Sequence, residues 1–140
     1  MIYYGDEIGM EGGDDPDNRR PMVWEDRGYT EPDDELREYV SELAEMRDEN
    51  EVLRRGDIYK IPTENERVYA FQRSSSQEDI LVFINSGEDE TELEISAEDL
   101  TGVEIGDSAY DIIDGREVEI EDKSLIIDLQ PVSGAVISLD

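Results

Sequence analysis

The spacing of the apolar residues changes at Gly56, and this change limits the possible folds more than any other feature of the sequence. After Gly56, short blocks of alternating apolar and polar residues are separated by polar or glycine-containing turns. A period of two is typical of strands with one buried face, and short strands at regular spacing predict a sandwich. We therefore predict a mainly β fold, with an antiparallel β-sandwich of Greek-key type over residues 57–140. The blocks are centred on Val68–Phe71, Ile80–Ile84, Leu93–Ile95, Tyr110–Ile113, Val118–Ile120, Leu125–Ile127 and Ala135–Leu139.

Residues 1–56 predict other elements. Met1–Gly5 is continuously apolar, as buried parallel strands are. No other segment supplies parallel neighbours for it, so we expect it to belong to a sheet that lies mostly outside this sequence. Residues 11–35 have the composition of a loop, and a helix over about 33–48 follows it. The apolar stripe of that helix is formed by Leu36, Tyr39, Val40, Leu43 and Met46.

The excess of acidic over basic residues indicates the environment in which the protein works. Asp and Glu number 40 against 12 Lys and Arg, for a formal net charge of -28, and Lys60 and Lys123 are the only lysines. Concentrated salt screens such a charge, so we expect a halophilic source and a cytoplasmic location in a high-salt cytosol. The same charge argues against nucleic acid and anionic membranes as partners. A disordered acidic tail is the alternative, but ordered apolar blocks argue against it.

The missing residue types exclude several chemistries. The sequence has no Cys and no His, so it offers no disulfide, no thiolate metal site and no Ser-His or Cys-His nucleophile pair. No apolar run approaches the roughly 20 residues of a membrane span, and no signal peptide is visible. We expect no metal and no cofactor.

Two motifs near the start resemble a known enzyme family. The segment Ile2-Tyr3-Tyr4-Gly5-Asp6-Glu7-Ile8-Gly9, then Asp15-Pro16-Asp17-Asn18-Arg19 and Pro21-Met22-Val23-Trp24, resembles the eighth barrel strand and following loop of the α-amylase superfamily. Within it, the similarity is to the branch of neopullulanase, cyclomaltodextrinase and maltogenic amylase. The resemblance implies that residues 1–56 are the last strand, substrate loop and last helix of a truncated TIM barrel. Residues 57–140 would be the family's C-terminal sandwich domain.

The resemblance also implies a function. Family members cleave α-glucosidic bonds with retention, using carboxyl groups about 5 Å apart. These groups come from barrel strands four, five and seven, none of which is present, so we expect no catalytic residue here and an inactive chain. The loop's Asp15 and Arg19 would contact glucose units on the donor side of the cleaved bond. The alternative is an Asp15–Arg19 pair that only shapes the loop.

Other residues have simpler interpretations. The carboxylates of Glu11, Asp14, Asp15 and Asp17 do not follow the twelve-residue calcium-loop spacing, so we assign no calcium site. Glu7 is expected to orient neighbouring groups. The aromatic residues Tyr3, Tyr4 and Trp24 are expected in a core or barrel wall rather than stacked on sugars.

The sandwich has two candidate roles. It could bind glycan as a module of its own, or it could stabilise the barrel. Glycan-binding modules present exposed aromatic platforms, whereas Tyr69, Phe71, Phe83 and Tyr110 fall in apolar alternation and predict core packing. The expected partners are an α-glucan oligosaccharide in the parent enzyme and the missing barrel half, if it is separately encoded. Exposed Ile2, Tyr3 and Tyr4 would favour association of the isolated chain.

Overall fold

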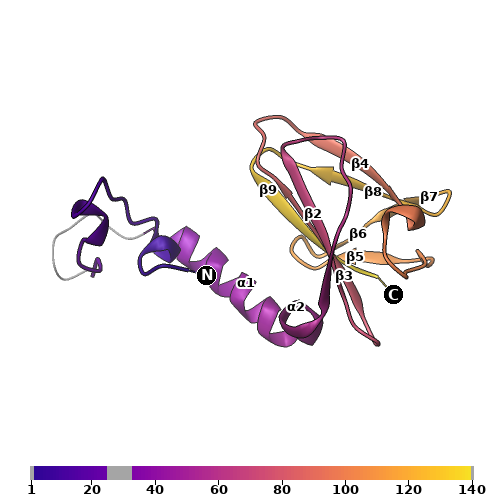
Figure 1. The fold of residues 1–140 in the computed structure, drawn as a ribbon, viewed down its shortest axis with the longest axis horizontal. Helices are drawn as coiled ribbons and strands as arrows, with labels where there is room; N and C mark the ends of the chain where they lie inside the picture. The colour runs from indigo at the N-terminus through magenta and orange to yellow at the C-terminus, as the bar shows by residue number, and fades with distance from the viewer. Residues whose placement is uncertain (1, 25–32, 140) are drawn as a thin grey trace. The chain divides into compact units, whose positions relative to one another are not determined.

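The computed structural model describes residues 2–24 and 33–139, which form two compact units, Met1–Glu49 and Asn50–Asp140 (Figure 1). Both α-helices precede the strands along the described chain, as the change of period at Gly56 predicts. The division of domains at 56/57 stays a prediction. The elements are η1 (Asp6–Ile8), η2 (Asp17–Arg19), α1 (Asp34–Glu49), α2 (Glu51–Arg55), β1 (Asp57–Lys60), β2 (Val68–Ser74), β3 (Asp79–Asn85), β4 (Thr91–Ser96), η4 (Ala97–Asp99), β5 (Ala109–Asp111), β6 (Arg116–Glu117), β7 (Glu119–Glu121), β8 (Ser124–Leu129) and β9 (Ser133–Leu139).

The first unit is built around the start of α1. The Asp33 carboxylate accepts a hydrogen bond from the backbone N–H of Leu36 at 2.9 Å, which caps the helix. The Asp33 N–H donates to the carbonyl of Ile8 at 3.2 Å, and Ile8 is buried. The predicted helix over 33–48 is thus confirmed. In the described ranges, no helix is long and apolar enough to cross a membrane.

The expected strand over Met1–Gly5 is wrong for this structure. Residues 2–5 form no ladder, and the chain turns at Tyr4 and Gly5 into η1. A parallel strand is held by hydrogen bonds to its neighbours, and the described residues of this unit contain no other strand. Ile2, Tyr3 and Tyr4 are consequently exposed, and so is Trp24, so none of these four packs in a core here.

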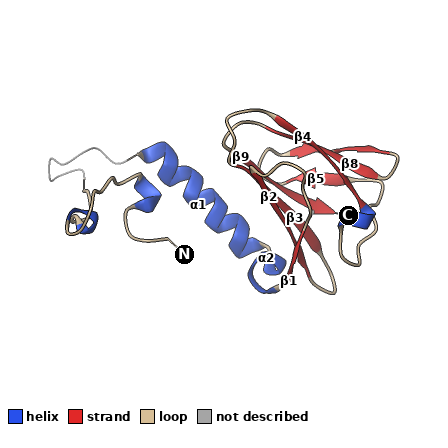
Figure 2. Cartoon of the chain, turned by 45° about the horizontal axis from the view of Figure 1, so that its top comes forward, coloured by secondary structure: helices blue, strands red, loops and turns tan. Residues whose placement is uncertain are grey.

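The second unit consists of two antiparallel sheets packed face to face (Figure 2). The larger sheet has the strand order β1-β2-β3-β9-β5-β6, and the smaller has the order β4-β8-β7. Strand β9 lies between β3 and β5, so neighbours in the larger sheet are not consecutive in sequence. The mainly β class and the sandwich are therefore confirmed.

The core lies between the sheets. Phe83 of β3 and Leu125 of β8 are fully buried, and their neighbours on the inner faces join them in one cluster. Opposed residues in antiparallel strands share a face, so the registers Ala70↔Phe83 and Phe83↔Ala135 place all three on the inner side. Burial of both inner faces fixes the register of each strand.

Two buried amides connect loops to the larger sheet. Gln72 of β2 donates to Asp79 at 2.9 Å and to the carbonyl of Thr101 at 3.1 Å, and accepts from the N–H of Thr101 at 2.9 Å. Asn85 of β3 donates to the carbonyls of Asp89 and Gln130 at 2.9 and 3.0 Å. Both side chains are satisfied although they are buried, as stable interiors require.

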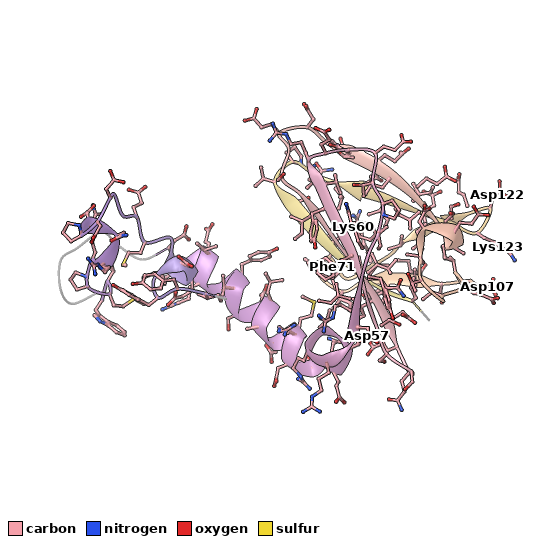
Figure 3. All side chains as sticks on the ribbon, viewed as in Figure 1. Asp57, Lys60, Phe71, Asp107, Asp122 and Lys123 are labelled. Atoms are coloured by element: carbon pink, nitrogen blue, oxygen red, sulfur yellow. The ribbon has the colours of Figure 1, made fainter. Side chains whose placement is uncertain are left out.

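Two hairpins of the second unit are closed by tight turns. The Asp114-Gly115 dipeptide, which is typical of such turns, joins β5 to β6, and Gly115 has a φ of 66°. The turn between β7 and β8 consists of Asp122 and Lys123, which have positive φ values of 48° and 67° (Figure 3). Two successive positive φ values give a turn whose twist matches that of the flanking strands.

Core packing was expected for four aromatic residues, and it is wrong for all but Phe83. Phe83 is in the core, but Tyr69 and Tyr110 are exposed on the outer side of the larger sheet, and Phe71 beside Tyr69 is only partly buried. In β2 the alternation Val68-Tyr69-Ala70-Phe71 is apolar on both sides, so hydrophobicity alone does not identify the inner face.

Candidate functional site

The candidate site is the loop that contains Asp15 and Arg19, in the first unit. The Arg19 guanidinium, at the end of η2, donates to the Asp15 carboxylate, four residues earlier in the sequence. Both side chains remain open to solvent, with 69% of Asp15 and 60% of Arg19 exposed. The structure therefore brings the two predicted residues together and presents them at the surface. An exposed carboxylate can accept hydrogen bonds from sugar hydroxyls, and an exposed guanidinium can donate hydrogen bonds to them.

A second ion pair, which the sequence analysis did not predict, organises the same loop. The Arg20 guanidinium donates to both carboxylate oxygens of Asp17, at 2.7 and 2.5 Å. Asp17 also accepts from the backbone N–H of Gly13 at 2.9 Å, and Arg20 donates to the carbonyl of Glu11 at 3.1 Å. This bidentate ion pair, the Asp17–Arg20 fork, joins the two ends of the loop. It therefore positions the Asp15–Arg19 pair between them.

Gly12 lets the loop close on itself. A Cβ atom at this position would lie 3.0 Å from the Cα of Asn18 and 3.4 Å from the carbonyl oxygen of Asp17, both of which are backbone atoms. The loop is also linked to the preceding segment, because the Tyr4 hydroxyl donates to the carbonyl of Arg20 at 2.8 Å. The two Asp residues followed by two Arg residues in Asp15–Arg20 were the available signal for both pairs, at spacings of four and three.

Asp6 and Glu7 of the first unit have local partners. Glu7 accepts from the N–H of Gly5 at 2.8 Å, and Asp6 accepts from the N–H of Tyr3 at 2.9 Å. Glu7 thus orients the backbone next to it, as expected. Within the described ranges, no group of three or more acidic side chains is arranged to hold a metal ion.

The Asp17–Arg20 pair predicts a measurable titration. The Arg20 guanidinium, and after it the Gly13 N–H, holds the pKa of the Asp17 carboxyl below its usual value. A folded-state pKa below the unfolded value adds stability above the unfolded pKa, and that stability is lost as the pH falls through the folded pKa. We expect carboxyl NMR to show Asp17 titrating below about pH 3.8, the unfolded value, with loop order lost in that range.

The substitution Arg20→Gln should return the titration of Asp17 toward its usual value, because it removes the largest cause of the shift. Arg19→Gln is the matched control, since Arg19 pairs with Asp15 instead. An unchanged Asp17 titration in Arg20→Gln would contradict the described pairing.

A hollow in the second unit is lined by polar residues at the ends of β2 and β3, including Asn65, Arg67 and Thr91. There the Asn65 side chain donates to the Thr91 hydroxyl at 3.1 Å and accepts from the N–H of Arg67 at 2.9 Å. The Asn65 amide group is thus already hydrogen-bonded to neighbouring loop residues, so this hollow has a structural role.

Comparison with known proteins identifies the sandwich. The profile of the family described as Maltogenic Amylase, C-terminal domain, matches residues 60–136, which include β2 to β8 and most of β9. The chain belongs to this family. The resemblance to maltogenic amylase is therefore confirmed for the sandwich.

Two curated relatives and one solved structure match almost the whole chain. Neopullulanase 2 of Thermoactinomyces vulgaris is 35% identical over 98% of the chain, and the match covers 22% of that protein. Cyclomaltodextrinase of Geobacillus thermopakistaniensis is 32% identical over 93% of the chain and 21% of that protein. The structure of α-amylase from Geobacillus thermoleovorans, complexed with acarbose, matches 99% of the chain and 29% of that protein, with 25% identity and a TM-score of 0.81.

These matches relate the chain to a small part of larger enzymes. The chain spans about a fifth of the length of these two curated relatives. It carries the C-terminal domain of this group of α-glucan-hydrolysing enzymes, and the segment with Asp15 and Arg19 lies inside the matched region.

Proposed function

We propose that this chain supplies the last barrel segment, the substrate loop and the C-terminal sandwich of a retaining α-glucan hydrolase. The observation that carries this proposal is the Asp15–Arg19 pair, held at the surface by the Asp17–Arg20 fork. Such a preorganised pair fits the donor-side sugar contacts that the family resemblance implies. The substrates would be maltooligosaccharides or cyclodextrins.

The chain would need the remaining strands of a barrel to act. By the family resemblance, none of the three catalytic carboxyl groups lies in residues 1–140. By the same resemblance, the remaining barrel strands would complete the enzyme, and we place it in the high-salt cytosol of a halophile on the strength of the charge of -28. The purified chain in about 2 M KCl, where charge repulsion is screened, is expected to release no reducing sugar from either substrate.

A chimera tests the role of the loop. In this chimera, the chain replaces the matching segment of Neopullulanase 2. Loss of a hydrogen-bonded charged contact costs roughly 1.5–3 kcal/mol, so Asp15→Ala and Arg19→Ala should each lower kcat/KM for maltooligosaccharide about 10- to 100-fold. Asp14→Ala is the matched control, because it removes the same charge from the adjacent position, and its kcat/KM should stay within about twofold of the parent.

Two results would contradict this assignment. One is equal kinetics for all three variants. The other is a loss of kcat/KM in Asp15→Ala that is accompanied by a lower melting temperature, which would mean that the pair only shapes the loop. Clear turnover by the isolated chain would overturn the proposed dependence on a barrel.

A further inference from the structure

The turn that connects β8 to β9 contains a residue in an unfavourable backbone conformation. Val132 has a φ of 50°, which lies in the left-handed region that a β-branched residue adopts only under strain. It follows Pro131, and a proline before a residue of positive φ is the pattern of a type II turn, where glycine or asparagine normally takes the second position. Val132 is also 79% exposed, so no burial of its side chain compensates for the strain.

Hydrogen bonds hold this turn in place. The Val132 N–H donates to the carbonyl of Gly87 at 3.1 Å. The carbonyl of Gln130 accepts from the buried amide of Asn85 at 3.0 Å and from the Ser133 hydroxyl at 2.7 Å. A residue keeps a sparsely populated conformation only where the surrounding structure imposes it. Here the return of the chain from β8 to β9 of the same molecule imposes the conformation of Val132.

Strand β9 contributes to the core from a central position. It lies in the larger sheet between β3 and β5, whereas β8 lies in the smaller sheet (Figure 1). Its ladder with β3 extends over the whole of both strands, and Ile137 also pairs with Asp111 on β5. Ala135, Val136 and Ile137 are buried. The position between β3 and β5 is the same in every copy of the chain, so a β9 from another copy can fill it with identical contacts.

We propose that two copies of this chain exchange β9, so that the β9 of each lies between β3 and β5 of the other. The hinge consists of Pro131 and Val132. Every contact of β9 is kept in such a dimer, so the closed monomer and the exchanged dimer differ mainly in the hinge. An extended hinge has negative φ values, and exchange therefore relieves the strain at Val132. Short hinge loops under strain favour exchange of this kind.

The other turn with positive φ values offers no comparable hinge. Among the described residues other than glycine, positive φ values occur at Asp122, Lys123 and Val132. Asp122 and Lys123 form a two-residue turn between neighbouring strands of one sheet, where two positive φ values are favoured. Val132 instead connects strands of different sheets. The strain is thus specific to the connection that leads into β9.

Charge opposes the exchange at low ionic strength. Exchange brings together the ends of two sandwiches at which the hinge lies. The loop from β3 to β4, which supplies Gly87 to the hinge, also carries Glu88, Asp89 and Glu90. Each copy has a formal net charge of -28, so the two copies repel. At about 1 M salt the Debye length is only ~3 Å. The exchanged dimer is therefore expected in concentrated KCl and not in dilute buffer.

The first experiment measures the dimer fraction of the full chain after refolding from urea. Refolding at about 100 μM chain in about 2 M KCl allows exchange, and sedimentation velocity then separates dimer from monomer. Val132→Gly should lower the dimer fraction about tenfold or more, because glycine adopts the closed turn without strain. Val132→Asn should act in the same direction, since asparagine also tolerates this conformation. Asp122→Gly is the matched control: it removes a side chain at a φ of 48° in the other turn and should leave the dimer fraction unchanged.

A second experiment identifies the exchanged strand. The sequence has no cysteine, so Val82→Cys combined with Val136→Cys introduces one pair, at opposed positions of β3 and β9. Opposed Cα atoms of antiparallel strands are about 4.5–5.5 Å apart, within the range that a disulfide spans. After oxidation of the separated dimer, exchange predicts disulfides between the two chains, seen as a covalent dimer on a non-reducing denaturing gel. In the separated monomer, the same pair should close within one chain.

Four results would overturn the proposal. The first is a chain that stays monomeric after refolding at every KCl concentration, and the second is an equal dimer fraction in the parent and in Val132→Gly. The third is a dimer whose disulfides lie within single chains, which would assign association to another surface, such as exposed Ile2, Tyr3 and Tyr4. The fourth is a dimer fraction that falls as KCl rises. The proposed function is tested separately, by the kinetics of the substrate-loop variants.

Discussion

Phe83→Ala is expected to destabilise the sandwich by about 3–5 kcal/mol, which is a large part of the total stability of a domain of this size. Phe83 is fully buried between the sheets, in contact with the core formed by both inner faces. Its truncation removes an aromatic ring and leaves a cavity that the ladders to β2 and β9 prevent from closing. Urea unfolding in about 2 M KCl measures the change as a lower midpoint at constant slope.

The neighbouring residue provides the control. Ile84 follows Phe83 on the same strand but points to the outer face, so Ile84→Ala in the isolated chain should cost less than about 1 kcal/mol. If Phe83→Ala does not fold, Phe83→Leu gives a smaller and measurable loss, again larger than that of Ile84→Ala. Equal losses at the two positions would contradict the assignment of inner and outer faces.

The second large effect is the dependence of stability on salt. With a net charge of -28, the folded chain should gain stability steadily as KCl rises from about 0.01 M to about 1 M, because the Debye length falls from roughly 30 Å to roughly 3 Å. Compaction brings the carboxylates together, so screening favours the folded state over the unfolded one. Circular dichroism melts across this range measure the effect.

A variant with less charge tests the cause. Glu92→Gln, Glu94→Gln and Asp128→Asn combined remove three charges from one sheet face. The combined variant should be more stable than the parent at low salt and should gain less from added KCl. A melting temperature that does not change with salt in the parent would refute the electrostatic explanation and, with it, the argument for a halophilic source.

Elements that depend on local pattern were predictable from the sequence. The helix expected over 33–48 is α1, because its apolar stripe and Asp33 cap are both encoded locally. The run Ile80–Ile84 is the centre of β3, and Asp114-Gly115 is the hairpin turn. The family resemblance of the chain was confirmed by a relative that matches 98% of it.

Features that depend on distant partners were not predictable. Met1–Gly5 has the composition of a strand, but a strand forms only where neighbouring strands supply hydrogen bonds. Tyr69 was expected in the core because both faces of β2 are apolar. Only the register with β3 and β9 shows which face meets the smaller sheet.

The candidate site was predictable in its residues but not in its construction. Asp15 and Arg19 were named from the loop motif, and the structure pairs them. The ion pair between Asp17 and Arg20 was not predictable, because a chain this acidic offers each arginine many carboxylates at short range. Backbone geometry, including the close approach of Gly12 to Asn18, selects among them.

The central place of β9 has a consequence for synthesis on the ribosome. Strand β3 pairs with Ser133–Leu139, so its second neighbour is translated only after the whole intervening segment. At about 5–20 residues per second, β3 waits a few seconds with one edge unpaired. During that interval the nascent larger sheet is open to pairing with other chains. A cell that makes this protein therefore gains from any factor that shields β3 until Leu139 has left the exit tunnel.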